Sequence, residues 1–236
     1  MPLSLREKQT AERRRRILDS AARLIRQTGG TDFPMLALAA KAGVSPATPY
    51  NLFGSKAGVL YALLNRSLDH ITRDSLIFAP ADPFEQVLEA GGIAAELFAR
   101  DPGFFRPLFQ FLLGVRDVVH RPRFMDRSLE YWRHALGAAV EGGLLPPEID
   151  RDELARELLI HFAGVLELWI HKELDEEAFR AQILYGTTLL LLGLARGGAH
   201  RRLRKRLKTI KRKLPQRFTF ASAGASHVEP RTGSAA

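Results

Sequence analysis

Cysteine is absent from the 236 residues, so the chain can form neither disulfide bonds nor thiolate metal sites. A reducing compartment suits such a chain, and we expect a cytoplasmic protein. Long apolar runs are also missing. The longest, near Leu189 to Leu192, is far shorter than the roughly 20 residues that cross a bilayer, and the N-terminus enters charged residues at once. We therefore expect a soluble protein with no membrane segment.

Recognisable catalytic patterns are missing too. The sequence shows no Ser-His-Asp order, no glycine-rich phosphate loop and no paired-carboxylate spacing. His161 and His171 each follow a glutamate by four residues, a spacing that suits a helical ion pair better than a metal site. The two histidines would also lie roughly 15 Å apart along a helix. We expect no enzyme activity, no cofactor and no metal.

Acidic residues are scarce at both ends of the chain. Residues 1–60 hold ten Lys and Arg against four Asp and Glu, a net charge of +6, whereas residues 61–199 hold fourteen against twenty-one, or −7. Residues 200–236 hold eleven against one, or +10. A basic head, an acidic body and a basic tail predict that anions bind at the ends of the chain.

Helical periodicity runs through almost the whole sequence, and no segment shows sustained strand alternation, so we predict an all-α fold. The first helix is expected to begin after Thr10 as N-cap and to end at Gly29-Gly30. The next three are expected from Asp32 or Pro34 to Ala42, from Pro46 to Phe53 with Ser45 as cap, and from Ser55 onward.

Acidic caps mark the later helices. Asp82 with Glu85 and Asp150 with Glu153 resemble capping boxes, and Asp175 is expected to cap a last long helix. Asp101-Pro102 and Arg121-Pro122 open two more, and the second of these is expected to end at Gly142-Gly143 and Pro146-Pro147. We divide the chain at residues 1–56, 57–198 and 199–236, and we expect the last segment to be a basic extension with a disordered tail.

The segment at residues 39–56, AAKAGVSPATPYNLFGSK, interrupts this helical pattern. Two short helices joined by a tight turn at Gly43 are typical of a helix-turn-helix, whose second helix enters the DNA major groove. Helical spacing points Val44, Pro49 and Phe53 inward and leaves the opposite face, which carries Ala47, Tyr50 and Asn51, for base edges. No acidic residue lies between Val44 and Lys56, as expected of a surface that meets phosphates.

These residues resemble the DNA-binding segment of the TetR family of transcriptional regulators over roughly residues 13–60. The matching positions are Ile17-Leu18, Ala21-Ala22, Gly29, Leu38-Ala39, Ala42-Gly43-Val44-Ser45, Thr48, Tyr50, Phe53 and Lys56. The resemblance implies a homodimer, with a DNA-binding domain at residues 1–56 that binds double-stranded DNA and a helical domain at residues 57–198 that binds an inducer and forms the dimer. It also implies phosphate contacts from Thr48, Tyr50 and Lys56, with Pro46, Ala47 and Asn51 nearer the bases.

The sequence departs from the family pattern at two places. Pro34-Met35-Leu36 stands where family members often cap the second helix with Thr or Ser, so Asp32 is expected to supply the cap instead. Leu52 replaces a position that is commonly polar or histidine. Ahead of the motif, the run Arg13 to Arg16 has two interpretations: a solvated helix face, or a contact from residues such as Arg14 to flanking phosphates or the minor groove.

Aromatic residues gather in the middle of the chain, either as ordinary core or as the lining of an apolar cavity. The candidate pocket residues are Phe105, Phe109, Trp132, His161 and Phe162, which would hold a small apolar or amphipathic ligand. The helices near 151–172 and 176–195 carry more apolar surface than one subunit covers, so we expect them to pair with their copies in a homodimer.

The basic tail carries nine Lys and Arg between residues 201 and 213 around a stripe of Leu203, Leu207, Ile210 and Leu214. It is interpreted as a solvated extension, an auxiliary nucleic-acid contact or a membrane-surface helix. The function predicted for the whole chain is a dimeric repressor of a palindromic operator that a small molecule releases. The alternative is a DNA-binding dimer without a small-molecule ligand, either constitutive or regulated by a protein partner.

Overall fold

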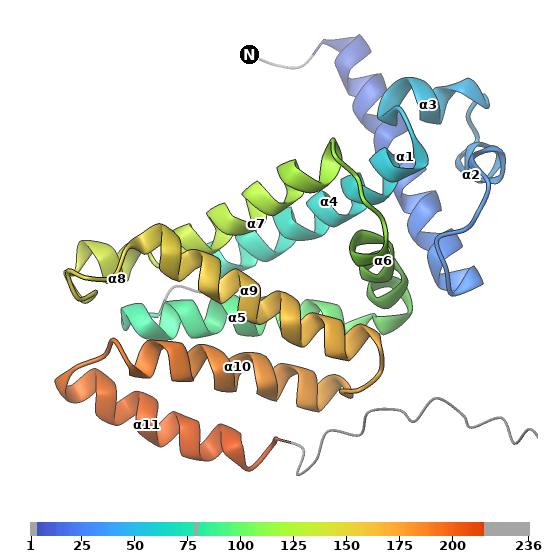
Figure 1. The fold of residues 1–236 in the computed structure, drawn as a ribbon. Helices are drawn as coiled ribbons and strands as arrows, with labels where there is room; N and C mark the ends of the chain where they lie inside the picture. The colour runs from blue at the N-terminus through green and yellow to red at the C-terminus, as the bar shows by residue number, and fades with distance from the viewer. Residues whose placement is uncertain (1–3, 78–79, 215–236) are drawn as a thin grey trace, which may run out of the picture.

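The computed structural model describes residues 4–77 and 80–214, and every regular element within these ranges is a helix (Figure 1). This confirms the predicted all-α fold. The helices are α1 (Leu5–Thr28), α2 (Met35–Ala42), α3 (Ala47–Phe53), α4 (Lys56–Ile77), α5 (Pro83–Arg100), α6 (Pro102–Gly114), α7 (His120–Ala135), α8 (Gly137–Glu141), α9 (Arg151–Ile170), α10 (Glu176–Leu192) and α11 (Gly197–Lys211).

The first helix begins earlier than the sequence prediction. Ser4 is its N-cap: the Ser4 hydroxyl accepts a bond from the backbone N–H of Glu7 at 3.3 Å, and the Glu7 carboxylate accepts one from the Ser4 backbone N–H at 2.8 Å. This reciprocal capping box satisfies two donors that a helix start otherwise leaves open. The predicted N-cap at Thr10 is wrong, because Thr10 lies inside the helix and its hydroxyl bonds the carbonyl of Arg6.

Two other predicted caps differ from the structure. Pro34 is the N-cap of α2 and no side chain caps that helix, so Asp32 does not have the predicted role. The Ser45 hydroxyl bonds the Thr48 hydroxyl at 2.8 Å rather than a backbone N–H at the start of α3. By contrast, Asp82, Asp150 and Asp175 cap α5, α9 and α10 through bonds from backbone N–H groups, as predicted.

Helix α4 joins the two parts of the fold. Its first turn lies under α3 and its later turns pack against α5 and α7, so it runs without a break from the N-terminal helices into the C-terminal ones (Figure 1). The predicted domain boundary at residues 56 and 57 falls at the start of this helix. Any shift of α4 therefore moves the surface on which α3 packs.

In the C-terminal part, α10 lies between α5, α9 and α11. The core is rich in aromatic rings: Trp169 is fully buried and stacks on Phe179 with ring centroids 4.8 Å apart. The predicted single helix that ends at Gly142-Gly143 is instead two, α7 and the short α8, which separate at Leu136. None of the helices in the described ranges is long and apolar enough to cross a membrane.

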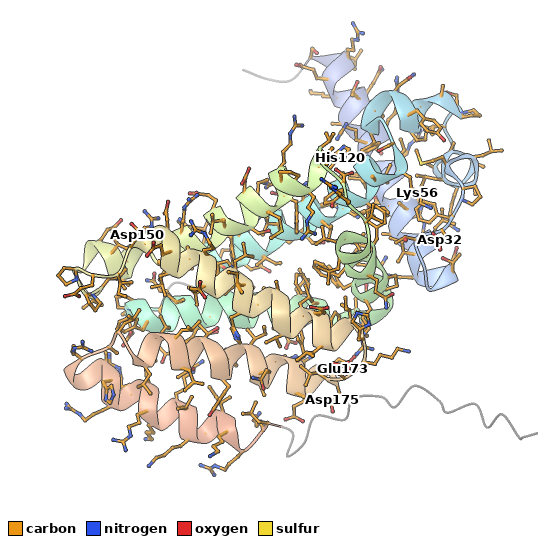
Figure 2. All side chains as sticks on the ribbon, in the orientation of Figure 1. Asp32, Lys56, His120, Asp150, Glu173 and Asp175 are labelled. Carbon is orange, nitrogen blue, oxygen red and sulfur yellow. The ribbon has the colours of Figure 1, made fainter. Side chains whose placement is uncertain are left out.

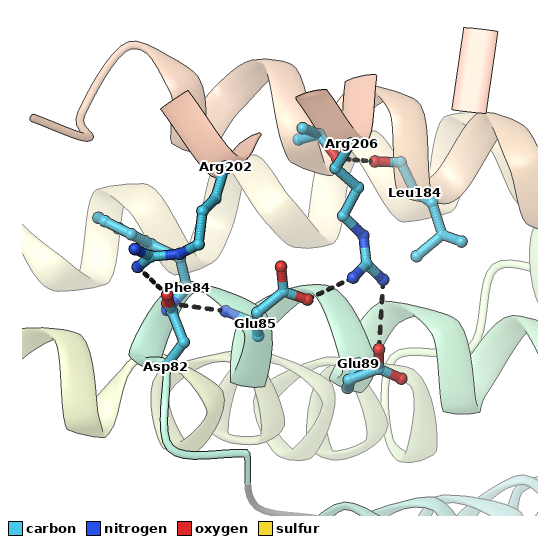
Figure 3. A network of polar contacts seen from close by, with 8 residues as sticks. Asp82, Phe84, Glu85, Glu89, Leu184, Arg202 and Arg206 are labelled. Carbon is cyan, nitrogen blue, oxygen red and sulfur yellow. Dashed lines mark hydrogen bonds and ion pairs between the residues drawn. The ribbon is translucent and has the colours of Figure 1, made fainter. Parts of the chain in front are cut away.

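Helix α11 packs along α10 and α5. Its apolar residues Leu203 and Ile210 are buried, Arg202 forms an ion pair with Asp82, and Arg206 pairs with both Glu85 and Glu89 on α5 (Figure 3). Up to residue 214, the basic extension is therefore docked on the body and does not extend into solvent. The predicted disordered tail lies outside the described residues.

Candidate nucleic-acid interface and effector cavity

The turn between α2 and α3 depends on Gly43. This residue has φ of 63°, in the left-handed region that favours glycine. The N–H of Gly43 bonds the carbonyl of Ala40 and the N–H of Val44 bonds that of Ala39, both at 3.1 Å. These bonds close α2 and reverse the chain within a few residues, so that α3 leaves at a steep angle.

The two faces of α3 are those that its spacing predicts. Pro49 and Phe53 are buried and Val44 is half-buried against the core, whereas Pro46, Ala47 and Asn51 are exposed. Tyr50 is 52% exposed although it is aromatic. Among the described residues, no side-chain hydrogen bond holds Tyr50 or Asn51, and Thr48 bonds only Ser45. The exposed face is therefore free to bind an external partner.

Arg14 and Lys56 flank α3 and have partners within the chain. Arg14 donates to the carbonyl of Leu52 at 2.6 Å and its guanidinium lies 4.3 Å from the centre of the Phe53 ring. Lys56 donates to the carbonyl of Phe33 at 3.5 Å and lies 3.8 Å from a carboxylate oxygen of the exposed Asp32 (Figure 2). Both side chains fasten α3 and α4 to neighbouring segments. Their phosphate contacts remain predictions.

Gly58 is a position at which α4 has no room for a side chain. A Cβ atom at this position would overlap the carbonyl oxygen of Phe53, the last residue of α3, and would lie 3.3 Å from Nε2 of His120 at the start of α7. The His120 ring also stacks on Tyr61 of α4, with centroids 5.6 Å apart. Helices α3, α4 and α7 therefore come together around Gly58. Neither Gly58 nor His120 stands out in the sequence pattern.

Asp117 organises the start of α7. Its carboxylate accepts bonds from the backbone N–H groups of Val119 at 2.9 Å and His120 at 2.5 Å, and from Nδ1–H of His120 at 3.0 Å. Burial alone would raise its pKa, but these hydrogen bonds and the adjacent imidazole outweigh burial and lower the pKa of Asp117 to about 2. The helix thus begins at His120 and not, as predicted, at Arg121-Pro122.

We expect Asp117→Asn to lower the free energy of unfolding at neutral pH by about 1–2 kcal/mol, because the amide can still cap α7 but carries no charge. The folded pKa lies below the ordinary value of 3.8, so the ionised carboxylate stabilises the fold above that value, and this contribution disappears as the pH falls toward 2. Urea unfolding of both proteins over this pH range measures the difference between their free energies of unfolding. If this difference stayed constant down to about pH 2, the lowered pKa of Asp117 would be contradicted.

A cavity of about 100 Å³ lies between α4, α5, α6, α7 and α9. Three of the five predicted pocket residues, Phe109, Trp132 and Phe162, line it. Phe105 does not, because its ring packs on Phe98 and Phe104 with centroids 4.7 and 4.8 Å away. The other lining residues are mainly aliphatic and include Leu64, Leu68, Ile71, Leu112, Met125, Leu159, Ala163 and Leu166.

His161 also lies outside the cavity lining. It faces α10, where Nε2–H donates to the carbonyl of Ile183 at 3.2 Å and the ring covers Gly186. Burial lowers the pKa of His161 and this bond opposes the shift. The prediction that His161 belongs to the pocket, and that its spacing serves a pair with Glu157, is corrected: the imidazole is used to join α9 and α10.

The cavity is almost wholly apolar. Ser67, Ser128 and Tyr131 border it, but their hydroxyls already bond backbone carbonyls of Leu63, Phe124 and Ala90. Arg121 is the charged residue in the lining, and one of its terminal nitrogens donates to the carbonyl of Leu112 at 2.9 Å. The cavity therefore suits an apolar molecule with at most one acceptor group, placed at Arg121. Nothing in the local sequence around this arginine predicts that position.

Residues 17–63 match the family described as "Bacterial regulatory proteins, tetR family". Among curated proteins, the HTH-type transcriptional regulator BetI of Brucella canis is 39% identical over 62 residues, which are 26% of this chain and 31% of BetI. BetI of Brucella anthropi is 37% identical over 62 residues, 26% of this chain and 32% of that protein. The chain thus covers about a third of the length of these curated relatives.

Solved structures are similar over a larger part of the chain. A putative TetR-family transcriptional regulator from Syntrophomonas wolfei has a TM-score of 0.65 and 21% identity, covering 77% of this chain and 96% of its own. The TetR-family repressor FadR of Thermus thermophilus, in complex with lauroyl-CoA, has a TM-score of 0.66 and 23% identity, covering 78% and 100%. At this identity the likeness shows the fold, including the helical C-terminal part.

Proposed function

Because residues 17–63 match the tetR family of bacterial regulatory proteins, we propose that the chain is a homodimeric repressor that binds a palindromic operator and releases it when a small apolar molecule occupies the cavity. The observation that carries this proposal is the course of α4. Its first turn supports α3, and Leu64, Leu68 and Ile71 of the same helix line the cavity. One rigid element thus joins both candidate sites.

The operator would lie against the exposed face of α3. Asn51 carries the donor and acceptor that pair bidentately with adenine, and Ala47 can contact a thymine methyl group. Thr48 and Tyr50 place hydroxyls at the edge of the same face, where phosphates run. The base contacts would discriminate between sequences, whereas the phosphate contacts would set the affinity and the register on the duplex.

The dimer would form through α9 and α10. Ile160 on α9 is 55% exposed and Leu189 on α10 is 44% exposed. Gly164, one turn from Ile160, is also exposed, and because it has no side chain a partner helix can approach closely there. Pairing the two helices with their copies buries these residues in a four-helix bundle. A two-fold axis there gives two recognition helices, which fit half-sites about 34–36 Å apart.

The size of the cavity supports a response to ligand. A dry cavity of about 150 Å³ takes up benzene, and the cavity here is about 100 Å³. We therefore expect a ligand larger than one ring to push α4 and α7 apart. Because Gly58 of α4 lies against both the end of α3 and His120 of α7, this movement changes the spacing of the two copies of α3 in the dimer. The ligand acts only if it binds the DNA-incompetent state more tightly.

Selection of bound fragments from random DNA tests the operator proposal and supplies the probe. We then expect Lys56→Ala to weaken selected and random duplexes about equally, because a phosphate contact is blind to sequence. Asn51→Ala should instead cost about 1–3 kcal/mol on the selected site and relax preference at one base pair. Equal losses on both duplexes for both variants would contradict this division of roles.

A panel of apolar and monoanionic molecules tests the ligand proposal on the same DNA. Fatty acids belong in it, and lauroyl-CoA, the polyanionic molecule bound to FadR of Thermus thermophilus, is added for comparison. We expect at least one member to raise the melting temperature of the free protein and to release the selected duplex. A dimer that binds the duplex but ignores the whole panel would favour the alternative, a DNA-binding protein that is constitutive or controlled by a protein partner.

A further inference from the structure

Helix α11 has two faces with different surroundings. On the inner face, Arg202 and Arg206 pair with Asp82, Glu85 and Glu89, and Lys213, just beyond the helix, lies 3.8 Å from Glu177. The outer face consists of Arg201, Arg204, Lys205, Lys208, Lys211 and Arg212, all exposed. At 3.6 residues per turn these six side chains fall within about a third of the helix circumference. Within the described ranges none of the six has a carboxylate partner.

The outer face is held in a fixed orientation by the inner one. Leu203 and Ile210 are buried against the body, and the guanidinium of Arg206 is gripped between two carboxylates of α5 (Figure 3). Such docking cancels the inner charges locally and leaves the outer charges directed at solvent. If α11 were only solvated, there would be no reason for its unpaired cations to gather on one face and its paired cations on the other.

A lipid surface does not fit this arrangement. Interfacial helices bind by inserting an apolar face among the acyl chains, and here the apolar residues Leu203 and Ile210 are committed to the body. A protein partner does not fit either, because interfaces between proteins are anchored by aromatic and apolar side chains and are depleted in lysine. The outer face offers neither an aromatic nor a large apolar side chain.

The phosphates of a nucleic-acid duplex do fit. Neighbouring outer cations follow one another every three or four residues, or roughly 5–6 Å along the helix. From Arg201 to Arg212 the row extends about 16 Å, a length over which a duplex presents roughly ten charges. In Figure 1, α11 lies at the end of the molecule away from α1, α2 and α3. A duplex seated on α3 is stiff over about 150 base pairs and does not fold back to α11 of the same subunit.

We propose that the outer face of α11 is a second nucleic-acid-binding surface, which holds the phosphates of a DNA duplex other than the one at α3 and reads no bases. The surface goes beyond the repressor function proposed above and does not depend on operator recognition. Together, the two surfaces allow the protein to bridge two DNA segments.

The test separates the two surfaces in the full-length protein. Tyr50→Asp with Asn51→Asp places acids on the exposed face of α3 and repels phosphates there. In this background, Arg201, Arg204, Lys205 and Lys208 are changed to Gln, which keeps helix propensity. The matched control changes Arg73, Arg116, Arg123 and Lys172 to Gln, four exposed cations away from α11 that also lack an ion-pair partner in the described parts of the chain. Binding of a short mixed-sequence duplex is measured by fluorescence anisotropy as salt is raised.

We expect the background protein to bind the duplex, and the α11 substitutions to weaken that binding about tenfold or more at about 50 mM salt, with a salt slope smaller by about 0.9 for each phosphate that is no longer neutralised. The control should change affinity less than about twofold at the same salt. Equal losses in both sets, or a background protein that binds no duplex, would overturn the proposal. So would α11 substitutions that abolish binding to phosphatidylserine vesicles or polyglutamate and leave duplex binding unchanged.

Bridging is measured with the selected operator fixed on beads and a labelled second duplex in solution. The protein should retain the second duplex on the beads, and the α11 substitutions should release it without reducing binding to the operator. Retention unaffected by these substitutions counts against the proposal. If the Asp substitutions on α3 leave all duplex binding intact while those on α11 abolish it, the second surface stands and the repressor function fails.

Discussion

Replacing Gly58 by alanine is expected to weaken operator binding about 100-fold or more, because each half of the site would lose a base contact worth about 1–3 kcal/mol. The added methyl group would overlap the carbonyl oxygen of Phe53, so α3 must move away from α4. The strain should also lower the free energy of unfolding by about 1–3 kcal/mol. Mobility shift on the selected duplex and urea unfolding measure the two effects.

Gly103→Ala is the matched control. Gly103 also lies in the first turn of a helix, α6, but a methyl group there meets no atom within 4 Å. Alanine should therefore be neutral or stabilise the protein by up to about 1 kcal/mol through helix propensity. If Gly58→Ala bound the operator as tightly as the unchanged protein, the contact between α3 and α4 would not set the position of the recognition helix.

Ala163→Leu is expected to produce a repressor that no longer responds to ligand. Ala163 lines the cavity from α9, and a leucine side chain would occupy space that the ligand needs. Filling a cavity of this kind commonly stabilises a protein by about 0.5–2 kcal/mol. We therefore expect a higher melting temperature, unchanged operator affinity and at least a tenfold loss of ligand affinity, or about 1.4 kcal/mol.

Anilinonaphthalene sulfonate, an apolar molecule with one anionic group, is the probe for this experiment because its chemistry suits the apolar lining and Arg121. Its fluorescence should rise with the unchanged protein and with Ala163→Ser, which keeps the space open, but not with Ala163→Leu. A leucine variant that binds the probe and releases DNA like the unchanged protein would show that the effector site lies elsewhere.

Sequence periodicity predicted the helix-turn-helix well because its determinants are local. Gly43 needs a left-handed backbone, and the spacing of Pro49 and Phe53 against Tyr50 and Asn51 fixes which side of α3 is buried. Both follow from residues within one or two turns of each other. The capping box of Ser4 and Glu7 is equally local, although Thr10 was predicted as the N-cap of this helix.

The rest depends on contacts between residues far apart in the chain. His161 had a glutamate at helical spacing, yet its partner is the carbonyl of Ile183, 22 residues away. Gly58 carries no signal of its own; only the approach of Phe53 and His120 makes a side chain impossible there. The cavity is likewise bounded by five helices, so aromatic enrichment could predict a cavity in the region but not that Phe105 faces away from it.

The docking of α11 also determines what its removal would do. A chain shortened at Gly198 would lack the guanidinium groups that neutralise Asp82, Glu85 and Glu89 and would uncover the α10 surface on which α11 packs. The shortened protein would therefore carry more net negative charge and expose more apolar surface. Its DNA binding would weaken and it would tend to aggregate because of these exposed carboxylates and apolar side chains. Both effects would occur even if α11 itself bound no DNA.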